Sequence, residues 1–105
     1  MNYTIKMSDT AKQDLRDIAM WLFRKTNDIE LSKKFVNELR DSCKTLNLFP
    51  KAGAFPKDRV MSSQGYRYIS YKEYLIFYLI DDEKLTVIIM AIIRENRDYM
   101  RVFAH

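Results

Sequence analysis

Residues 66–80 read Tyr66-Arg67-Tyr68-Ile69-Ser70-Tyr71-Lys72-Glu73-Tyr74-Leu75-Ile76-Phe77-Tyr78-Leu79-Ile80, two aromatic and β-branched runs on either side of Lys72-Glu73. A polar turn at residues 81–84 leads to a third run at residues 85–93. Such runs, separated by short polar breaks, predict an antiparallel meander of three strands. The last two runs are almost continuously apolar. We therefore expect cover on both faces, either from this chain or from helices on one face and a partner on the other.

Two amphipathic helices are predicted upstream of the meander. Tyr3-Thr4-Ile5 alternates like a short strand, and Ser8 is a suitable N-cap for a helix of about 8–25. Asn27 with Glu30 forms a second capping signature, and apolar residues at spacings of three and four extend a second helix to about Leu48. The short connection between these helices predicts an antiparallel hairpin.

Two features of these helices are interpreted as structural. Asp14 and Asp17 lie on the polar face of the first helix, so we assign them to solvated surface and not to acid–base chemistry. Cys43 lies in the apolar stripe of the second helix and is expected to be a core residue rather than a nucleophile. A single cysteine also excludes an intramolecular disulfide and fits a reducing compartment.

Length and composition predict one domain, residues 1–105, with 48% hydrophobic residues and little loop. The sequence shows no signal-peptide pattern and no apolar run near the roughly 20 residues of a membrane helix, so we expect a soluble cytoplasmic protein. The net charge of +4 is spread evenly over both halves, unlike that of a dedicated duplex-DNA binder.

The segment between the second helix and the meander is more distinctive. Residues 50–65 hold both prolines and both glycines, which predicts a long ordered loop, and such loops are often functional or partner-facing. Within residues 51–72 the only acid is Asp58, against five basic residues: Lys51, Lys57, Arg59, Arg67 and Lys72. This composition predicts a local basic surface.

The order of elements, with its residues, resembles the RelE/ParE superfamily of toxins from bacterial type II toxin–antitoxin modules. The most specific part is the ordered set Tyr66-Arg67, Tyr74 to Tyr78, Ile88 to Ile93 and Arg97-Asp98; a weaker part comprises Ser8, Ala11, Leu15, Ile18, Leu48, Pro50 and Gly53. The resemblance covers essentially the whole chain. It implies an α+β domain in β-α-α-β-β-β order, with a two-helix hairpin packed on one face of a mainly antiparallel sheet. It also implies a cognate antitoxin protein that covers the toxin with an extended and helical segment.

The superfamily divides by target. Relatives like RelE cut mRNA on the ribosome, whereas relatives like ParE poison DNA gyrase, with growth arrest and plasmid stabilisation as the implied outcomes. The only histidine, His105, is the terminal residue, so histidine acid–base catalysis is not expected. The ribonuclease branch carries an arginine where Leu75 stands here, and Glu95 and Asn96 interrupt the cations Arg94 and Arg97.

These departures favour a ParE-like inhibitor of DNA gyrase that is not an enzyme. The match to that branch is imperfect, because many ParE-like relatives carry a histidine where Arg94 stands. The alternative is a metal-independent, ribosome-dependent mRNA endonuclease, and a third possibility is a degenerate toxin that only binds its antitoxin. The sequence contains no metal-binding cluster, Gly-rich phosphate loop or nucleophile elbow, so we expect no cofactor.

Candidate residues follow from each hypothesis. Those predicted for target binding are Arg94, Arg97 and Arg101, with Lys51, Lys57 and Arg59 on the loop. The three arginines would share one face of a helical turn that Tyr99, Val102 and Phe103 hold against the sheet. The nuclease alternative uses Arg67, Arg94, Arg97 and Tyr99. Predicted antitoxin contacts are Phe55, Trp21, Tyr71 and Tyr78. Two choices stay open: Arg67 either stacks on a tyrosine or binds a ligand, and Arg97-Asp98 either forms a local ion pair or binds the target.

Overall fold

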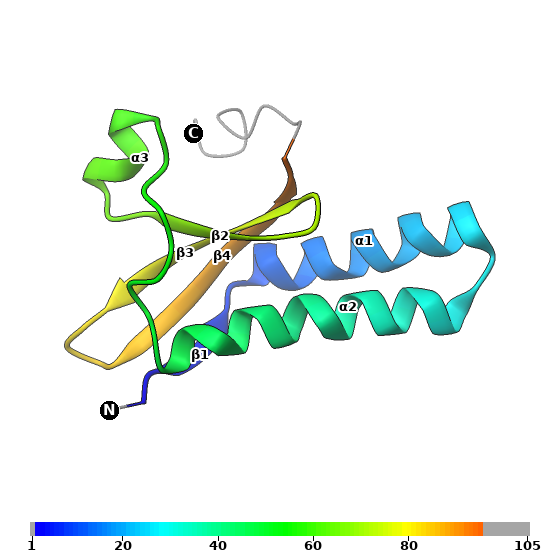
Figure 1. The fold of residues 1–105 in the computed structure, drawn as a ribbon, viewed down its shortest axis with the longest axis horizontal. Helices are drawn as coiled ribbons and strands as arrows, with labels where there is room; N and C mark the ends of the chain where they lie inside the picture. The colour runs from blue at the N-terminus through cyan, green and yellow to red at the C-terminus, as the bar shows by residue number, and fades with distance from the viewer. Residues whose placement is uncertain (1, 96–105) are drawn as a thin grey trace.

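The computed structural model describes residues 2–95 of the chain. Its elements are β1 (Thr4–Met7), α1 (Asp9–Thr26), α2 (Ile29–Lys44), the 3-10 turn η1 (Thr45–Asn47), α3 (Arg59–Ser63), β2 (Arg67–Tyr71), β3 (Tyr74–Asp81) and β4 (Thr86–Arg94). The strands form one sheet in the order β1-β4-β3-β2, in which β1 runs parallel to β4 and the other pairs are antiparallel. The α1–α2 hairpin lies against one face of this sheet (Figure 1). The predicted α+β fold and element order are confirmed.

The helix boundaries follow from caps. The Ser8 Oγ atom accepts a hydrogen bond from the Ala11 N–H at 3.0 Å, so α1 begins where the sequence predicted. The second cap differs from the prediction: Asp28, not Asn27, accepts from the Leu31 N–H at 3.1 Å. Asn27 instead adopts a left-handed conformation, φ 54°, and ends α1, because a short polar side chain tolerates this region.

The apolar runs of the meander bury side chains on both faces of the sheet. Tyr74, Ile76 and Tyr78 pack into the core beneath the helices, whereas Leu75 and Phe77 point to the opposite face. On that face they join a second cluster with Met61, Tyr66, Ala91 and Ile93. Residues 74–78 are buried throughout, as their unbroken apolar sequence predicted.

Only half of each hairpin helix packs on the sheet. The buried helix residues are Ala11, Leu15 and Ile18 in the first half of α1, and Val36, Leu39 and Cys43 toward the end of α2. Cys43 is therefore a core residue, as predicted, and burial raises the pKa of its thiol to about 12. The far end of the hairpin extends beyond the sheet (Figure 1) and exposes large apolar side chains, namely Met20, Trp21, Phe23, Ile29 and Leu31.

The segment predicted as one long loop contains a short helix, α3. Asp58 caps it by accepting from the Met61 N–H at 2.9 Å, a local signal that the sequence interpretation missed. Before this helix the loop runs along the outer edge of β2, where Ala54 and Tyr68 exchange two backbone hydrogen bonds of 2.9 Å. The loop therefore protects part of an edge strand that would otherwise be open.

Tyr78 anchors the loop to the core. Its hydroxyl donates to the Pro50 carbonyl at 2.7 Å and accepts from the Gly53 N–H at 2.9 Å. A Cβ atom at Gly53 would lie 2.5 Å from this hydroxyl, so only glycine fits there. The Tyr78 side chain is fully buried, which corrects its prediction as an antitoxin contact: its polar end is used inside the chain.

Replacing Tyr78 by Phe tests this anchor. The change leaves a carbonyl and a buried N–H without their partner, so we expect the free energy of unfolding to fall by about 1–3 kcal/mol. Tyr68→Phe is the matched control, because the Tyr68 hydroxyl makes no hydrogen bond with a described residue, and its stability should change by less than about 0.5 kcal/mol. Equal denaturation midpoints for the two variants would contradict the assignment.

Candidate functional site

The end of β4 lacks a strand neighbour on the side of α1. β1 pairs with β4 only from Thr86 to Ile89, whereas β4 continues to Arg94. The β3–β4 register shifts between Phe77, opposite Ala91, and Tyr78, opposite Ile89, so Met90 is an extra residue in a bulge. Beyond Ile89, no described strand pairs with this edge of β4.

Side chains at the start of α1 take the place of the missing strand. The Ser8 hydroxyl donates to the Met90 carbonyl at 2.9 Å, and the Asp14 Oδ2 atom accepts from the Ile92 N–H at 2.8 Å. Asp14 is thus a partner of the sheet and not a solvated residue, which corrects the sequence interpretation. Partial burial raises the pKa of Asp14, the hydrogen bond from the Ile92 N–H offsets part of this rise, and the charge of Asp17 adds to it. Asp17 is exposed, as predicted.

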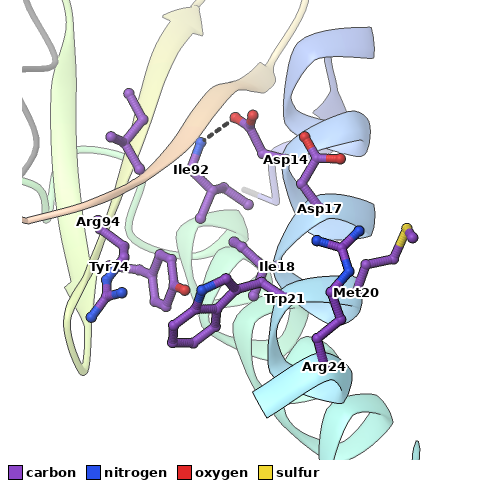
Figure 2. A pocket seen from close by; sticks show the side chains of 10 residues that line it. Asp14, Asp17, Ile18, Met20, Trp21, Arg24, Tyr74, Ile92 and Arg94 are labelled. Carbon is purple, nitrogen blue, oxygen red and sulfur yellow. Dashed lines mark hydrogen bonds between the residues drawn. The ribbon is translucent and has the colours of Figure 1, made fainter.

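Beside this edge, α1 and the end of β4 enclose an open cavity of about 390 Å³ (Figure 2). Ile18, Trp21 and Tyr74 supply its apolar lining. Charged groups of both signs complete the lining: Asp14, Asp17, Arg24 and Arg94. We call this feature the β4–α1 groove.

Arg94 is held at one end of the groove. Its Nη2 atom donates to the Glu73 Oε2 atom at 2.6 Å, and its guanidinium lies 4.9 Å from the centre of the Trp21 ring. The Glu73 carbonyl also accepts from the Glu95 N–H at 2.8 Å, which fixes the β2–β3 turn against the end of β4. The Arg94 side chain remains 34% exposed. It can therefore contact a partner, but from a fixed position.

The same turn holds a second cation over aromatic rings. The Lys72 ammonium lies 5.6 Å from the centre of the Phe35 ring and 5.5 Å from that of Tyr71. Lys72 adopts φ 51°, a left-handed conformation that is unfavourable for a lysine. Burial and a hydrogen bond to Glu38 raise the pKa of Tyr71. Tyr71, a predicted antitoxin contact, is partly exposed at this turn.

Arg67 lies at the other end of the sheet and stabilises the loop. Its guanidinium stacks 4.1 Å from the centre of the Phe55 ring and donates to the carbonyls of Gly53 and Lys51 at 3.0 and 3.3 Å. The open choice for Arg67 is therefore answered by a structural contact, with a phenylalanine instead of a tyrosine. Phe55 itself is 55% exposed.

The candidate cations do not form one cluster among the described residues. Arg67 lies opposite Tyr78 and Arg94 opposite Tyr74, so four positions of β3 separate them, about 13 Å along the strand. Lys51, Lys57 and Arg59 are exposed on the loop and α3. Arg97, Tyr99, Arg101 and the Arg97-Asp98 pair lie outside the described residues. Residues 2–95 contain no group of three or more side chains suited to a metal, and none of their helices is long and apolar enough to cross a membrane.

The role of Asp14 can be tested with two substitutions. Asp14→Ala removes the acceptor of the Ile92 N–H and should lower the free energy of unfolding by about 1–3 kcal/mol. Asp14→Asn keeps an oxygen acceptor and removes the buried charge, so its stability at neutral pH should equal or exceed that of the parent.

The two proteins should also differ in pH dependence. The pKa of Asp14 is higher in the folded than in the unfolded state, so the folded state binds its proton more tightly. The stability contributed by this group is then greatest below its unfolded pKa, about 4, and falls as pH rises through the folded value. Chemical denaturation across this range should show the fall in the parent and not in Asp14→Asn. Identical pH profiles would contradict the assignment.

Comparison with solved structures identifies proteins of the same fold. A chain from the chromosomal ParDE toxin–antitoxin system of P. aeruginosa superposes with a TM-score of 0.71 at 19% identity, covering 88% of this chain and 95% of that one. A chain of the RelBE2 toxin–antitoxin complex from Mycobacterium tuberculosis gives 0.65 at 21% identity, covering 90% and 99%. A doubly substituted E. coli RelE toxin in the free state gives 0.65 at 14% identity, covering 97% and 93%. At these identities the likeness shows the fold alone.

The sequence itself matches a family model. No curated protein matches this chain significantly. The model for the ParE toxin of the type II toxin–antitoxin system parDE, however, matches residues 5–99, which is most of its length. The superfamily resemblance expected from the sequence is confirmed, and the chain belongs to the ParE toxin family of type II toxin–antitoxin systems.

Proposed function

We propose that this toxin acts in the cytoplasm by binding and inhibiting DNA gyrase, that it does not cut RNA, and that a cognate antitoxin neutralises it. The match to the ParE family model supports the assignment to this branch. The choice between gyrase and the ribosome depends mainly on one observation, the environment of Leu75.

Leu75 is a buried apolar residue. Its side chain is 7% exposed and packs in the cluster that contains Phe77, Ala91 and Ile93. The ribonuclease branch of the superfamily carries an arginine at this position. A charge among these apolar neighbours would lose its hydration without gaining a partner. This side of β3 therefore supplies no cation for the phosphorane-like transition state of RNA cleavage.

The remaining described arginines of the nuclease hypothesis support the same conclusion. Arg67 is bound to the loop carbonyls and Phe55, and Arg94 to Glu73 and Trp21. A metal-free nuclease needs several cations converging on one phosphate. Arg67 and Arg94 lie too far apart along β3 to do so.

The exposed basic residues fit a binding function instead. Lys51, Lys57 and Arg59 project from the loop and α3, and Arg94 is partly exposed at the end of β4. With Arg97 and Arg101, which lie beyond the described residues, they would steer the toxin toward an acidic protein surface or a DNA-bound enzyme.

The apolar end of the hairpin supports neutralisation by a protein partner. Exposed patches of this kind mark interaction sites, and here they include Trp21 at 36% exposure and Met20 at 54%. Phe55 offers a further exposed ring on the loop. Two of the similar structures are described as toxin–antitoxin systems, which supports an antitoxin as the partner. The complex should bury more than about 1,000 Å² of surface.

The target can be identified with purified proteins. We expect the toxin to inhibit gyrase supercoiling of relaxed plasmid and to accumulate gyrase-linked DNA breaks. On translating ribosomes, primer extension should detect no new mRNA ends. The double change Lys57→Ala with Arg59→Ala should weaken gyrase inhibition while leaving stability nearly unchanged, since exposed charges contribute roughly 0–1 kcal/mol. Cleavage at ribosomal A-site codons, without an effect on gyrase, would replace this proposal with the mRNA endonuclease.

The antitoxin is expected to be the product of the neighbouring reading frame. Trp21→Ala should weaken its binding by about 10- to 100-fold, because a large aromatic side chain at an interface centre contributes strongly to affinity. Val60→Ala is the control, since Val60 is 61% exposed on α3. Calorimetric titration measures both variants, and a toxin that does not bind the neighbouring product would contradict the proposal.

A further inference from the structure

We propose that the β4–α1 groove binds an extended segment of the antitoxin, which adds to β4 where β1 ends. This inference rests on the proposed function and specifies the site and the chemistry of the partner. It depends on three observations: an open backbone edge, a cavity beside that edge, and an arginine without a partner.

The backbone of the end of β4 faces the groove. The Glu95 N–H donates to the Glu73 carbonyl, and Ile93 lies opposite Leu75, so residues 93 and 95 direct their backbone groups toward β3. The Ile92 N–H points the other way, to Asp14. Alternation along a strand then directs the Ile92 carbonyl and the Arg94 N–H to the same open edge. Such groups are a template for an added strand.

The cavity beside this edge can receive a side chain of that strand. Its volume of about 390 Å³ falls within the roughly 300–1,000 Å³ of pockets that hold ligands. Ile18 and Trp21 line it, and Met20 continues the apolar surface outward at 54% exposure. An apolar residue of the partner would fill the space between β4 and α1 (Figure 2).

The charges of the groove indicate what flanks this apolar residue. Asp14 accepts from the Ile92 N–H, Asp17 from the Gln13 side-chain amide at 2.8 Å, and Arg94 is paired with Glu73. Arg24 also lines the cavity and has neither a hydrogen bond nor an ion pair within residues 2–95. The segment that fits is therefore extended, with an apolar residue and a nearby Asp or Glu that meets Arg24. A second copy of this chain fits less well, because each carries a net charge of +4.

Amide hydrogen exchange at two neighbouring residues tests the added strand. The intact toxin is measured alone and in complex with the protein encoded by the neighbouring reading frame. Exchange of the Arg94 amide should slow by at least about tenfold in the complex, because it gains a hydrogen bond across the new strand pair. The Ile93 amide should change much less, because it already faces β3 and serves as the internal control.

A matched pair of variants tests the acidic contact. Arg24→Gln and Lys12→Gln each remove one positive charge from α1, but Lys12 is exposed and does not line the cavity. Arg24→Gln should weaken antitoxin binding by about tenfold more than Lys12→Gln, and both should remain folded because exposed charges add little stability.

The outcomes separate this inference from the proposed function. A tight complex with unchanged Arg94 exchange, or equal affinities for the two variants, would overturn the groove as the site and leave the antitoxin as partner. Slowed Arg94 exchange in the toxin alone at high concentration would assign the groove to a second copy and overturn it as well. If the neighbouring product does not bind at all, both the antitoxin proposal and this inference fail.

Discussion

Strand β4 has a strand neighbour on its α1 side for only part of its length, and much of the molecule follows from this mismatch. β1 has four residues and β4 has nine, so the second half of β4 presents buried backbone groups that need partners. The helix after β1 supplies two of them, through Ser8 and Asp14. These contacts hold the start of α1 against β4, and the space beyond them is the β4–α1 groove. The same edge that shapes the fold thus creates the surface on which a partner strand can add.

The hairpin extends this surface. Only the halves of α1 and α2 that lie over the sheet are buried, and the rest of each helix keeps apolar side chains without cover from the described residues. Apolar residues cost free energy when they remain in water, so their retention at the hairpin tip favours a partner that buries them. Trp21 lies where the tip meets the groove, since it lines the cavity and stacks on Arg94. One partner that follows the hairpin into the groove would cover both.

The arginines illustrate how a fold limits chemistry. Arg67 stabilises a loop by stacking on Phe55 and binding two carbonyls, and Arg94 joins a turn to a helix through Glu73 and Trp21. Side chains committed to such contacts are poorly suited to reorganise around a reacting phosphate, whereas they can present a fixed charge to a protein surface. The buried position of Leu75 agrees with this division.

The sequence alone determined the elements of this protein, because helices and strands are set by local signals. The Ser8 cap, the apolar stripe that buries Cys43 and the unbroken runs of the meander all predicted what the structure contains, and together they indicated the superfamily. The tertiary structure decided which side chains meet across the fold. Asp14 binds Ile92, 78 residues away, and Tyr78 turns its hydroxyl to a loop 25 or more residues earlier. An acid on a polar helix face and a tyrosine in a strand carry no local mark of such partners, because long-range pairing depends on the register of the sheet and on where the helix crosses it.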